Sequence, residues 1–258
     1  MSESGRTPVQ ETTHFGFEDV PVSDKSARVR DVFSSVARNY DMMNDLMSLG
    51  VHRAWKAAFV NRIALRPDMK FLDVAGGTGD IAFRIREKAR YGAAITVCDI
   101  NAEMLRVGKA RAVNRGILGP KSEIRWVCGN AEAVPAPVST YDVYTIAFGL
   151  RNVTNIPGAL TEARRVLRPG GQFLCLEFSK VVLPVLADLY DQYSFSILPK
   201  LGRYVARNEA AYRYLAESIR QFPDQATLAR MMEDAGLEQV KVQNLSGGIA
   251  AIHTARRI

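Results

Sequence analysis

The spacing of apolar residues predicts two helices near the start of this chain. Between residues 29 and 36 apolar side chains follow the i, i+3, i+4, i+7 spacing of an amphipathic helix, and Ser23 or Asp24 is placed to cap it. A second helical pattern spans about residues 51–63. Residues 1–22 carry no apolar periodicity, so we expect an N-terminal arm that is mobile or docked locally.

From about residue 70 short apolar runs alternate with helical stretches. The expected strands cover residues 71–74, 94–98, 124–127, 142–148 and 172–178. The expected helices cover residues 80–90, 102–115 and 224–235, with a further helix that ends at Arg168-Pro169-Gly170-Gly171. Strands that are apolar throughout and alternate with helices predict a parallel sheet buried on both faces.

The C-terminal pattern predicts an antiparallel finish to that sheet. Two strand-like runs, at residues 240–242 and 249–252, are joined by Ser246-Gly247-Gly248. A mostly parallel sheet of seven strands with an antiparallel terminal strand resembles the class I methyltransferase (Rossmann-like) α/β fold. We expect one domain over residues 23–258, with a helical lid at 23–65 and a helical insertion on the substrate side at 180–222.

A glycine-rich turn follows the first strand of this sheet. Ala75-Gly76-Gly77-Thr78-Gly79 connects that strand to the helix predicted from residue 80, and glycines let a ligand approach the backbone at a helix N-terminus. The stretch from Gly77 to Ala82 also fits the G-x-G-x-x-A form of a dinucleotide-binding fingerprint. The turn alone therefore leaves a nicotinamide cofactor and S-adenosylmethionine both open.

Three neighbours of the turn favour S-adenosylmethionine. Asp73, in the preceding strand, suits a cationic amino acid and would repel a pyrophosphate. Asp99 ends the second strand, where its carboxylate can accept hydrogen bonds from both hydroxyls of a ribose, which either cofactor contains. Asn130 and Ala131 follow the third strand and offer an amide beside a small residue for an adenine. The alternative for Asn130 is a plain turn residue.

The cysteines and histidines indicate no metal site. Each cysteine lies in or beside an apolar strand-like run, so we interpret all three as small buried residues: Cys98, Cys128 and Cys175. The histidines are far apart in sequence and have no further ligand at metal-binding spacing: His14, His52 and His253. We therefore expect no metal.

Charge and hydropathy limit where the protein is located and which partners it binds. No stretch of 18 apolar residues occurs and the N-terminus lacks a signal-peptide pattern, so we expect a cytoplasmic protein. The formal net charge of +7 permits nucleic acid, an anionic membrane or an anionic substrate. The fourth strand ends in Ala147-Phe148-Gly149-Leu150, unlike the Asn/Asp-Pro-Pro-Tyr/Phe motif of amine methylators. Since no basic-aromatic array occurs either, we expect no nucleic-acid partner.

Several blocks of the sequence resemble the ubiquinone/menaquinone biosynthesis C-methyltransferase family. They run from residue 12 into the C-terminal part, and several lie outside the cofactor turn: Thr12-Thr13-His14-Phe15-Gly16-Phe17, Tyr40-Asp41-Met42-Met43-Asn44-Asp45-Leu46-Met47-Ser48, Leu72-Asp73-Val74-Ala75-Gly76-Gly77-Thr78-Gly79-Asp80, Phe148-Gly149-Leu150-Arg151-Asn152-Val153, Leu176-Glu177-Phe178-Ser179-Lys180 and Tyr212-Arg213-Tyr214-Leu215-Ala216-Glu217-Ser218-Ile219. The chain departs from many members at Ala147, where they carry serine.

The resemblance implies methyl transfer from S-adenosylmethionine to a ring carbon of a polyprenylated benzoquinol or demethylmenaquinol. It implies cofactor contacts at Thr78, Asp99, Asn130 and Ala131. Gly77 in the glycine turn is a further candidate contact. Arg151 and Asn152 follow the fourth strand, where ligands of open sheets bind, and with Tyr40 they are the candidate catalytic residues. A guanidinium steadies a phenolate rather than taking its proton. Two alternatives stay open: Arg151 pairs with Glu177 or caps a helix, and Tyr40 is lid packing.

The remaining expectations concern partners. One face of a predicted helix is apolar and bordered by basic residues: Leu186, Leu189, Tyr190, Tyr193 and Ile197, with Lys180, Lys200 and Arg203. It either packs on the sheet or a partner subunit, or covers the isoprenoid tail and rests on the inner membrane surface. A homodimer or a quinone-biosynthesis complex is left open. The competing functions are methylation of RNA or protein, a nicotinamide-dependent oxidoreductase, and a non-catalytic scaffold.

Overall fold

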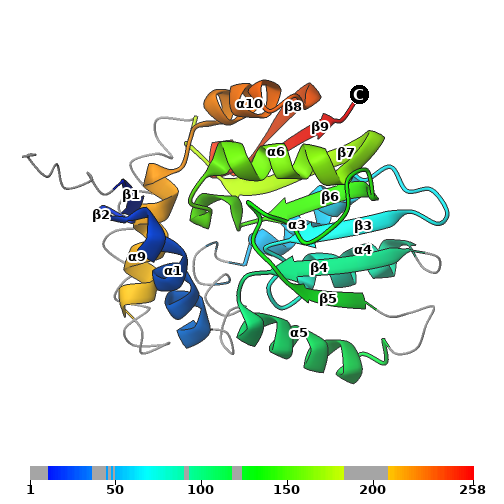
Figure 1. The fold of residues 1–258 in the computed structure, drawn as a ribbon, viewed down its shortest axis with the longest axis horizontal. Helices are drawn as coiled ribbons and strands as arrows, with labels where there is room; N and C mark the ends of the chain where they lie inside the picture. Colours follow the sequence, from blue (N-terminus) through cyan, green and yellow to red (C-terminus); the bar gives the residue numbers. More distant parts are fainter. Residues whose placement is uncertain are drawn as a thin grey trace, which may run out of the picture.

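The computed structural model describes residues 11–36, 45, 48, 50–89, 93–117, 124–182 and 209–258. The main sheet contains β3 (Lys70–Val74), β4 (Ala94–Asp99), β5 (Ile124–Cys128), β6 (Tyr141–Ala147), β7 (Leu167–Phe178), β8 (Glu238–Leu245) and β9 (Ala250–Arg256). The helices are α1 (Val22–Val36), α3 (His52–Asn61), α4 (Asp80–Ala89), α5 (Ala102–Asn114), α6 (Ile156–Val166), α9 (Glu209–Gln221) and α10 (Gln225–Asp234) (Figure 1).

The strand order of the seven-stranded sheet is β5-β4-β3-β6-β7-β9-β8. β3 to β7 pair in parallel, and β9 runs antiparallel to both β7 and β8. The expected class I layout is therefore confirmed, with the last strand of the chain inserted between β7 and β8. Connections leave β3 in one direction and β6 in the other, so the switch point where open sheets bind ligands lies between these two strands.

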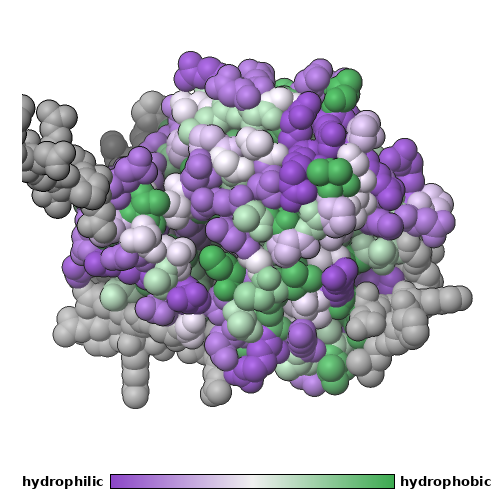
Figure 2. Space-filling view, in the orientation of Figure 1, coloured by the Kyte–Doolittle hydropathy of each residue, from purple (hydrophilic) through white to green (hydrophobic). Residues whose placement is uncertain are grey.

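Two apolar cores cover the two faces of this sheet. Successive residues of β3 illustrate the division, because Phe71 belongs to the core under α3, α4 and α9, and Leu72 to the core under α6 and α10. Both side chains are 1% exposed. Burial on both sides explains why the strands have apolar sequences without a polar alternation. On the face shown in Figure 2, apolar residues form small groups between hydrophilic ones.

The N-terminal segment forms a small hairpin against α9. β1 (Thr12–Phe15) pairs antiparallel with β2 (Glu18–Pro21), and Gly16 at φ +60° makes the turn. The Phe15 ring stacks on Tyr214 at a centroid distance of 4.3 Å, and the backbone N–H of Phe17 donates to Glu217 Oε2 at 3.2 Å. Figure 1 shows this hairpin beside α1 and α9 at one end of the molecule. Within the stretch expected as an arm, residues 12–21 form this hairpin.

Two local predictions were wrong. The expected cap at Ser23 or Asp24 is not formed because β2 leads directly into α1, which begins at Val22, so both residues lie in its first turn. Cys128 is exposed, whereas Cys98 and Cys175 are buried as expected. Cys128 ends β5, which is the edge strand of the sheet, and one of its sides has no neighbouring strand.

Candidate active site

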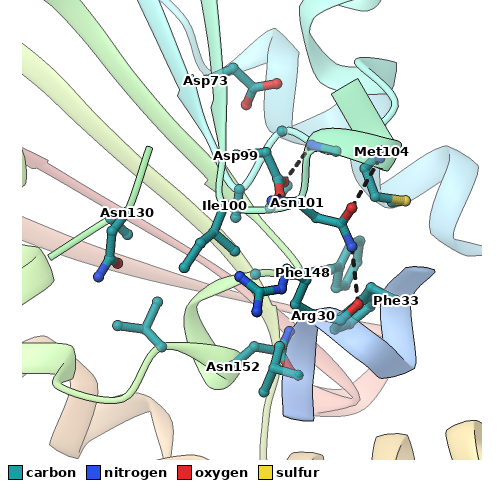
Figure 3. Close-up of a pocket in the computed structure, with 18 of the residues that line it drawn as sticks. Arg30, Phe33, Asp73, Asp99, Ile100, Asn101, Met104, Asn130, Phe148 and Asn152 are labelled. Atoms are coloured by element: carbon teal, nitrogen blue, oxygen red, sulfur yellow. Dashed lines mark hydrogen bonds between the residues drawn. The ribbon is translucent and has the colours of Figure 1, made fainter. Parts of the chain in front are cut away.

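A cavity opens at the carboxyl ends of β3, β4, β5 and β6, under α1 (Figure 3). It encloses about 1060 Å³ when its solvent-filled mouth is included. Every residue expected to contact the cofactor lines it: Gly77, Thr78, Asp99, Asn130 and Ala131. α1 contributes Val29, Arg30 and Phe33 to the covering wall, as a lid over the site would.

The glycine turn is shaped for close approach of a ligand. Gly79 has φ +85°, and a Cβ there would lie 2.5 Å from Trp126 Cη2. A Cβ at Gly76 would lie 2.7 Å from Val97 Cγ1. A side chain at either position would displace its neighbours, so the turn holds glycine at both, and Gly76 contributes backbone to the lining of the cavity.

Asp99 is tied to the turn through both of its oxygens. Oδ2 accepts the Gly77 N–H at 2.8 Å and Oδ1 accepts the Asn101 N–H at 2.8 Å. Burial raises the pKa of Asp99 to about 6, against the lowering effect of these two hydrogen bonds. Each carboxylate oxygen keeps a second lone pair. Asp99 can therefore accept a pair of hydroxyl hydrogens without losing the bonds that hold it.

Asp73 is a buried carboxylate with one unused oxygen. Its side chain accepts a hydrogen bond from Thr145 Oγ1 at 2.8 Å through Oδ1, whereas Oδ2 has no hydrogen-bond partner among the described residues. Burial, reinforced by Asp80 and Asp99, raises the pKa of Asp73 to about 7. A buried acceptor without a partner on a cavity wall is costly unless a donor binds there. The site thus fits a ligand that carries an ammonium group beside a ribose.

The opposite end of the cavity is formed by the turn after β5. Asn130 Oδ1 accepts the Glu132 N–H at 3.1 Å, which is the turn role weighed from the sequence, and the residue also lines the cavity. Thr78 also lines the cavity, and its Oγ1 accepts a hydrogen bond from Arg111 at 3.0 Å. The structural and ligand-binding interpretations of Asn130 are therefore compatible.

The loop after β6 carries two of the three candidate catalytic residues and places them differently. Asn152 lines the cavity. Arg151 does not belong to the lining: its side chain is 1% exposed, and NH1 lies 2.6 Å from both Glu177 Oε1 and Phe148 O. The pairing with Glu177, the alternative left open by the sequence, is the one formed. Tyr40 lies outside the described residues.

Two residues of the site were missed by the sequence reasoning. Tyr214 on α9 donates from its hydroxyl to Asn152 Oδ1 at 3.0 Å, and burial raises its pKa, so the phenol remains a donor. Lys56 on α3 lines the cavity with a side chain only 4% exposed. The available signal for Lys56 was its place on the buried face of a helix, next to Trp55, where a lysine needs a partner.

No metal-binding cluster of three His, Cys, Asp or Glu residues occurs within the described residues. His52 Nε2 lies 2.8 Å from Asp45 Oδ1, and His253 Nε2 lies 3.0 Å from the carbonyl oxygen of Gln225. Across the same described part of the chain, no helix is long and apolar enough to cross a membrane. The apolar face expected at residues 186–197, with Lys200 and Arg203, lies outside the described residues.

Comparison with known proteins agrees with this geometry. The family model of the ubiE/COQ5 methyltransferase family matches residues 22–257. Proteins named "Ubiquinone/menaquinone biosynthesis C-methyltransferase UbiE" are similar: that of Rhodopseudomonas palustris (strain HaA2) is 53% identical over 261 residues, covering 100% of both chains. The protein of the same name from Bordetella parapertussis is 52% identical over 249 residues, covering 96% of this chain and 94% of its own.

Solved structures share the fold at low sequence identity. The [4+2]-cyclase SpnF has a TM-score of 0.65 at 16% identity and covers 90% of this chain and 96% of its own. A SAM-dependent methyltransferase from Aquifex aeolicus has a TM-score of 0.58 at 15% identity, with 79% and 89% covered. The matches over the full length decide the assignment: this chain belongs to the ubiE/COQ5 methyltransferase family of S-adenosylmethionine-dependent enzymes.

Proposed function

We propose that this enzyme transfers the methyl group of S-adenosylmethionine to a ring carbon of a polyprenylated benzoquinol, of demethylmenaquinol, or of both. The observation that carries the proposal is the similarity over the whole chain to relatives named as ubiquinone/menaquinone biosynthesis C-methyltransferases. It favours a quinol over RNA or protein as the substrate. It also disfavours the oxidoreductase and scaffold alternatives.

The order of strands supports one orientation of the cofactor. Neighbouring strands are about 4.8 Å apart, so the residues after β5, β4 and β3 form successive positions along the cavity. Asn130 and Ala131 would hold the adenine, Asp99 the ribose and Asp73 the ammonium of methionine. The next strand, β6, leads to Phe148 and Asn152, so the methyl group would face this loop. The bound cofactor would supply the activated methyl group.

Methylation at carbon requires an electron-rich ring. A ring carbon is a weak nucleophile until the neighbouring phenol loses its proton, so the enzyme must stabilise a phenolate and align the carbon with the methyl group. Asn152, which lines the cavity, would donate to that oxygen from its amide nitrogen, because its Oδ1 already accepts the Tyr214 hydroxyl. Its Nδ2 is then the group left for the substrate.

Arg151 would act on the substrate indirectly, without touching it. Its buried ion pair with Glu177 ties the loop that carries Asn152 to β7, and its hydrogen bond to Phe148 O fixes the start of the loop. Arg151 would therefore position the loop and add a positive potential near the substrate phenolate. Tyr40, from the segment before α3, would close over the phenol group of the substrate. The Ala147 position, where many family members carry serine, contributes no side-chain hydrogen bond here.

The isoprenoid tail gives a reason for contact with a membrane. We place the enzyme in the cytoplasm, resting on the inner face of the membrane through its basic surface and the segment after Lys180. Flotation with anionic liposomes in low and high salt tests this part: binding that is lost in high salt supports it, and no binding in either contradicts it. A homodimer, or a complex of quinone-biosynthesis enzymes, is the expected assembly, testable by light scattering.

The activity is tested with both classes of precursor. Purified enzyme is incubated with S-adenosylmethionine and either a demethylated benzoquinol or demethylmenaquinol under reducing conditions, and the products are analysed by mass spectrometry. A mass increase of one methyl group on either ring supports the proposal and identifies the substrate. If neither ring gains a methyl group while the cofactor binds, the quinol proposal is wrong.

A further inference from the structure

Lys56 is a buried cation on the wall of the cavity and is not one of the proposed cofactor contacts. Its Nζ lies 2.7 Å from Asp80 Oδ2, and its side chain is 4% exposed. Asp80 also accepts from Arg84 Nε at 3.0 Å through its other oxygen. Burial would raise the pKa of Asp80, but Lys56 and Arg84 together hold it below its ordinary value. This cluster has two cations and one carboxylate.

The position of Lys56 places it at the methionine end of the cofactor. Asp80 is the first residue of α4, directly after the glycine turn, so its partner Nζ lies beside that turn. On its other side, Nζ lies 5.9 Å from the centre of the Phe148 ring, in the loop after β6. Lys56 therefore occupies the space between the ends of β3 and β6, where Asp73 also meets the cavity wall.

The methionine part of the cofactor is a zwitterion, with an ammonium group and an α-carboxylate. Asp73 can pair with only the first of these two charges. The unused oxygen of Asp73 matches the ammonium group, but the α-carboxylate needs a donor that is shielded from water. An ammonium group has three N–H donors, and the contact with Asp80 uses one. We propose that Lys56 binds the α-carboxylate of the cofactor's methionine while Asp73 faces its ammonium group, an assignment that rests on the proposed function.

The charges of the cluster favour this role over a plain tether between α3 and α4. A tether needs one cation for Asp80, and Arg84 already supplies it from the same helix at i+4. Lys56 adds a second, nearly inaccessible cation, so the single negative charge of Asp80 is shared between two positive groups. A further anion in the cavity would balance this buried charge. Among the described residues, Arg30 is the other cation on the wall, but it is exposed and comes from α1, which lies over the Asp99 and Asn101 side of the cavity.

Three ligands distinguish the loss of a contact with the carboxylate from a general disturbance of the cofactor site. S-adenosylmethionine carries both charges of the zwitterion, decarboxylated S-adenosylmethionine lacks only the carboxylate, and methylthioadenosine lacks the whole amino acid. Their dissociation constants are measured by calorimetry for the wild type, Lys56→Met and Arg84→Met. Arg84→Met is the matched control, because it also removes a partner of Asp80 but no group that lines the cavity.

We expect Lys56→Met to weaken S-adenosylmethionine at least tenfold and to change the other two ligands less than threefold. Arg84→Met should change all three less than threefold. Equal losses for all three ligands, or no loss for S-adenosylmethionine, would overturn the proposal. If Lys56→Met does not fold, Lys56→Gln, which keeps a polar end, is tested by the same comparison. Absence of S-adenosylmethionine binding by the wild type would instead refute the proposed function, and this inference with it.

Discussion

Replacement of Asp73 by asparagine is expected to stabilise the ligand-free protein at alkaline pH while it impairs cofactor binding. Burial raises the pKa of Asp73 to about 7, far above its ordinary value of 3.8. The folded protein therefore holds a proton on Asp73 that the unfolded chain has already lost. Because the folded state binds more protons between these two values, its stability falls as the pH rises through this window.

The size of the effect follows from the pKa. Each pH unit inside the window changes the free energy of unfolding by about 1.4 kcal/mol, so the wild type loses about 3 kcal/mol between pH 5 and pH 8 through Asp73. Asparagine does not titrate and keeps an oxygen for the Thr145 hydroxyl. Its amide nitrogen takes the place of the unpartnered Oδ2, which costs roughly 1–3 kcal/mol at every pH. Between pH 5 and pH 8 the free energy of unfolding of the variant, relative to that of the wild type, should therefore rise by about 3 kcal/mol.

Urea unfolding of both proteins at pH 5, 6, 7 and 8 measures this difference. A bound cofactor would present its ammonium group to Asp73, so saturating S-adenosylmethionine should flatten the extra pH slope of the wild type and leave the variant unaffected. Affinity of the wild type for S-adenosylmethionine should rise with pH up to about 7 for the same reason. If the stability difference is the same at pH 5 and pH 8, Asp73 is not held protonated and the reasoning fails.

Three further substitutions test other parts of the site. Asp99→Ala should raise the dissociation constant of S-adenosylmethionine about 100-fold in calorimetry, because two hydrogen bonds to a charged acceptor are worth about 3 kcal/mol together. A change below threefold would contradict the binding of the ribose by Asp99. Tyr214→Phe should lower kcat by about tenfold with an unchanged cofactor Kd, since Asn152 loses its orientation; an unchanged kcat would contradict that link. Glu177→Ala should destabilise the fold by about 3–5 kcal/mol in urea unfolding by leaving Arg151 buried and unpaired, and a loss below 1 kcal/mol would contradict the ion pair.

The parts of the site that follow strand ends were predictable from the sequence. Asp73, Asp99 and Asn130 each lie at or directly after an apolar run, and parallel strands bring their carboxyl ends to one edge of the sheet. The glycine turn was recognisable from its residues between a strand and a helix. The structure adds the reason for Gly79, where a Cβ would clash with Trp126. The alternation of strands and helices was therefore enough to place these residues at one edge of the sheet.

Contacts between distant segments were not predictable in the same way. The pairing of Arg151 with Glu177 depends on the register of β6 and β7, which sets Ala147 opposite Leu176. The sequence left this pairing open beside a helix cap and a catalytic role. Lys56 reaches Asp80 only through the packing of α3 on α4. The start of α1 depends on the hairpin that precedes it, which a helical period does not reveal.

The position of the transferred methyl group tests the central claim most directly. S-adenosylmethionine labelled with ¹³C in its methyl group is incubated with the enzyme and with each demethylated quinol, and the product is examined by carbon NMR. We expect the label on a ring carbon, with the chemical shift of an aryl methyl group, for at least one quinol. A label found on a phenolic oxygen as a methyl ether, or absent from both quinols, would contradict the account.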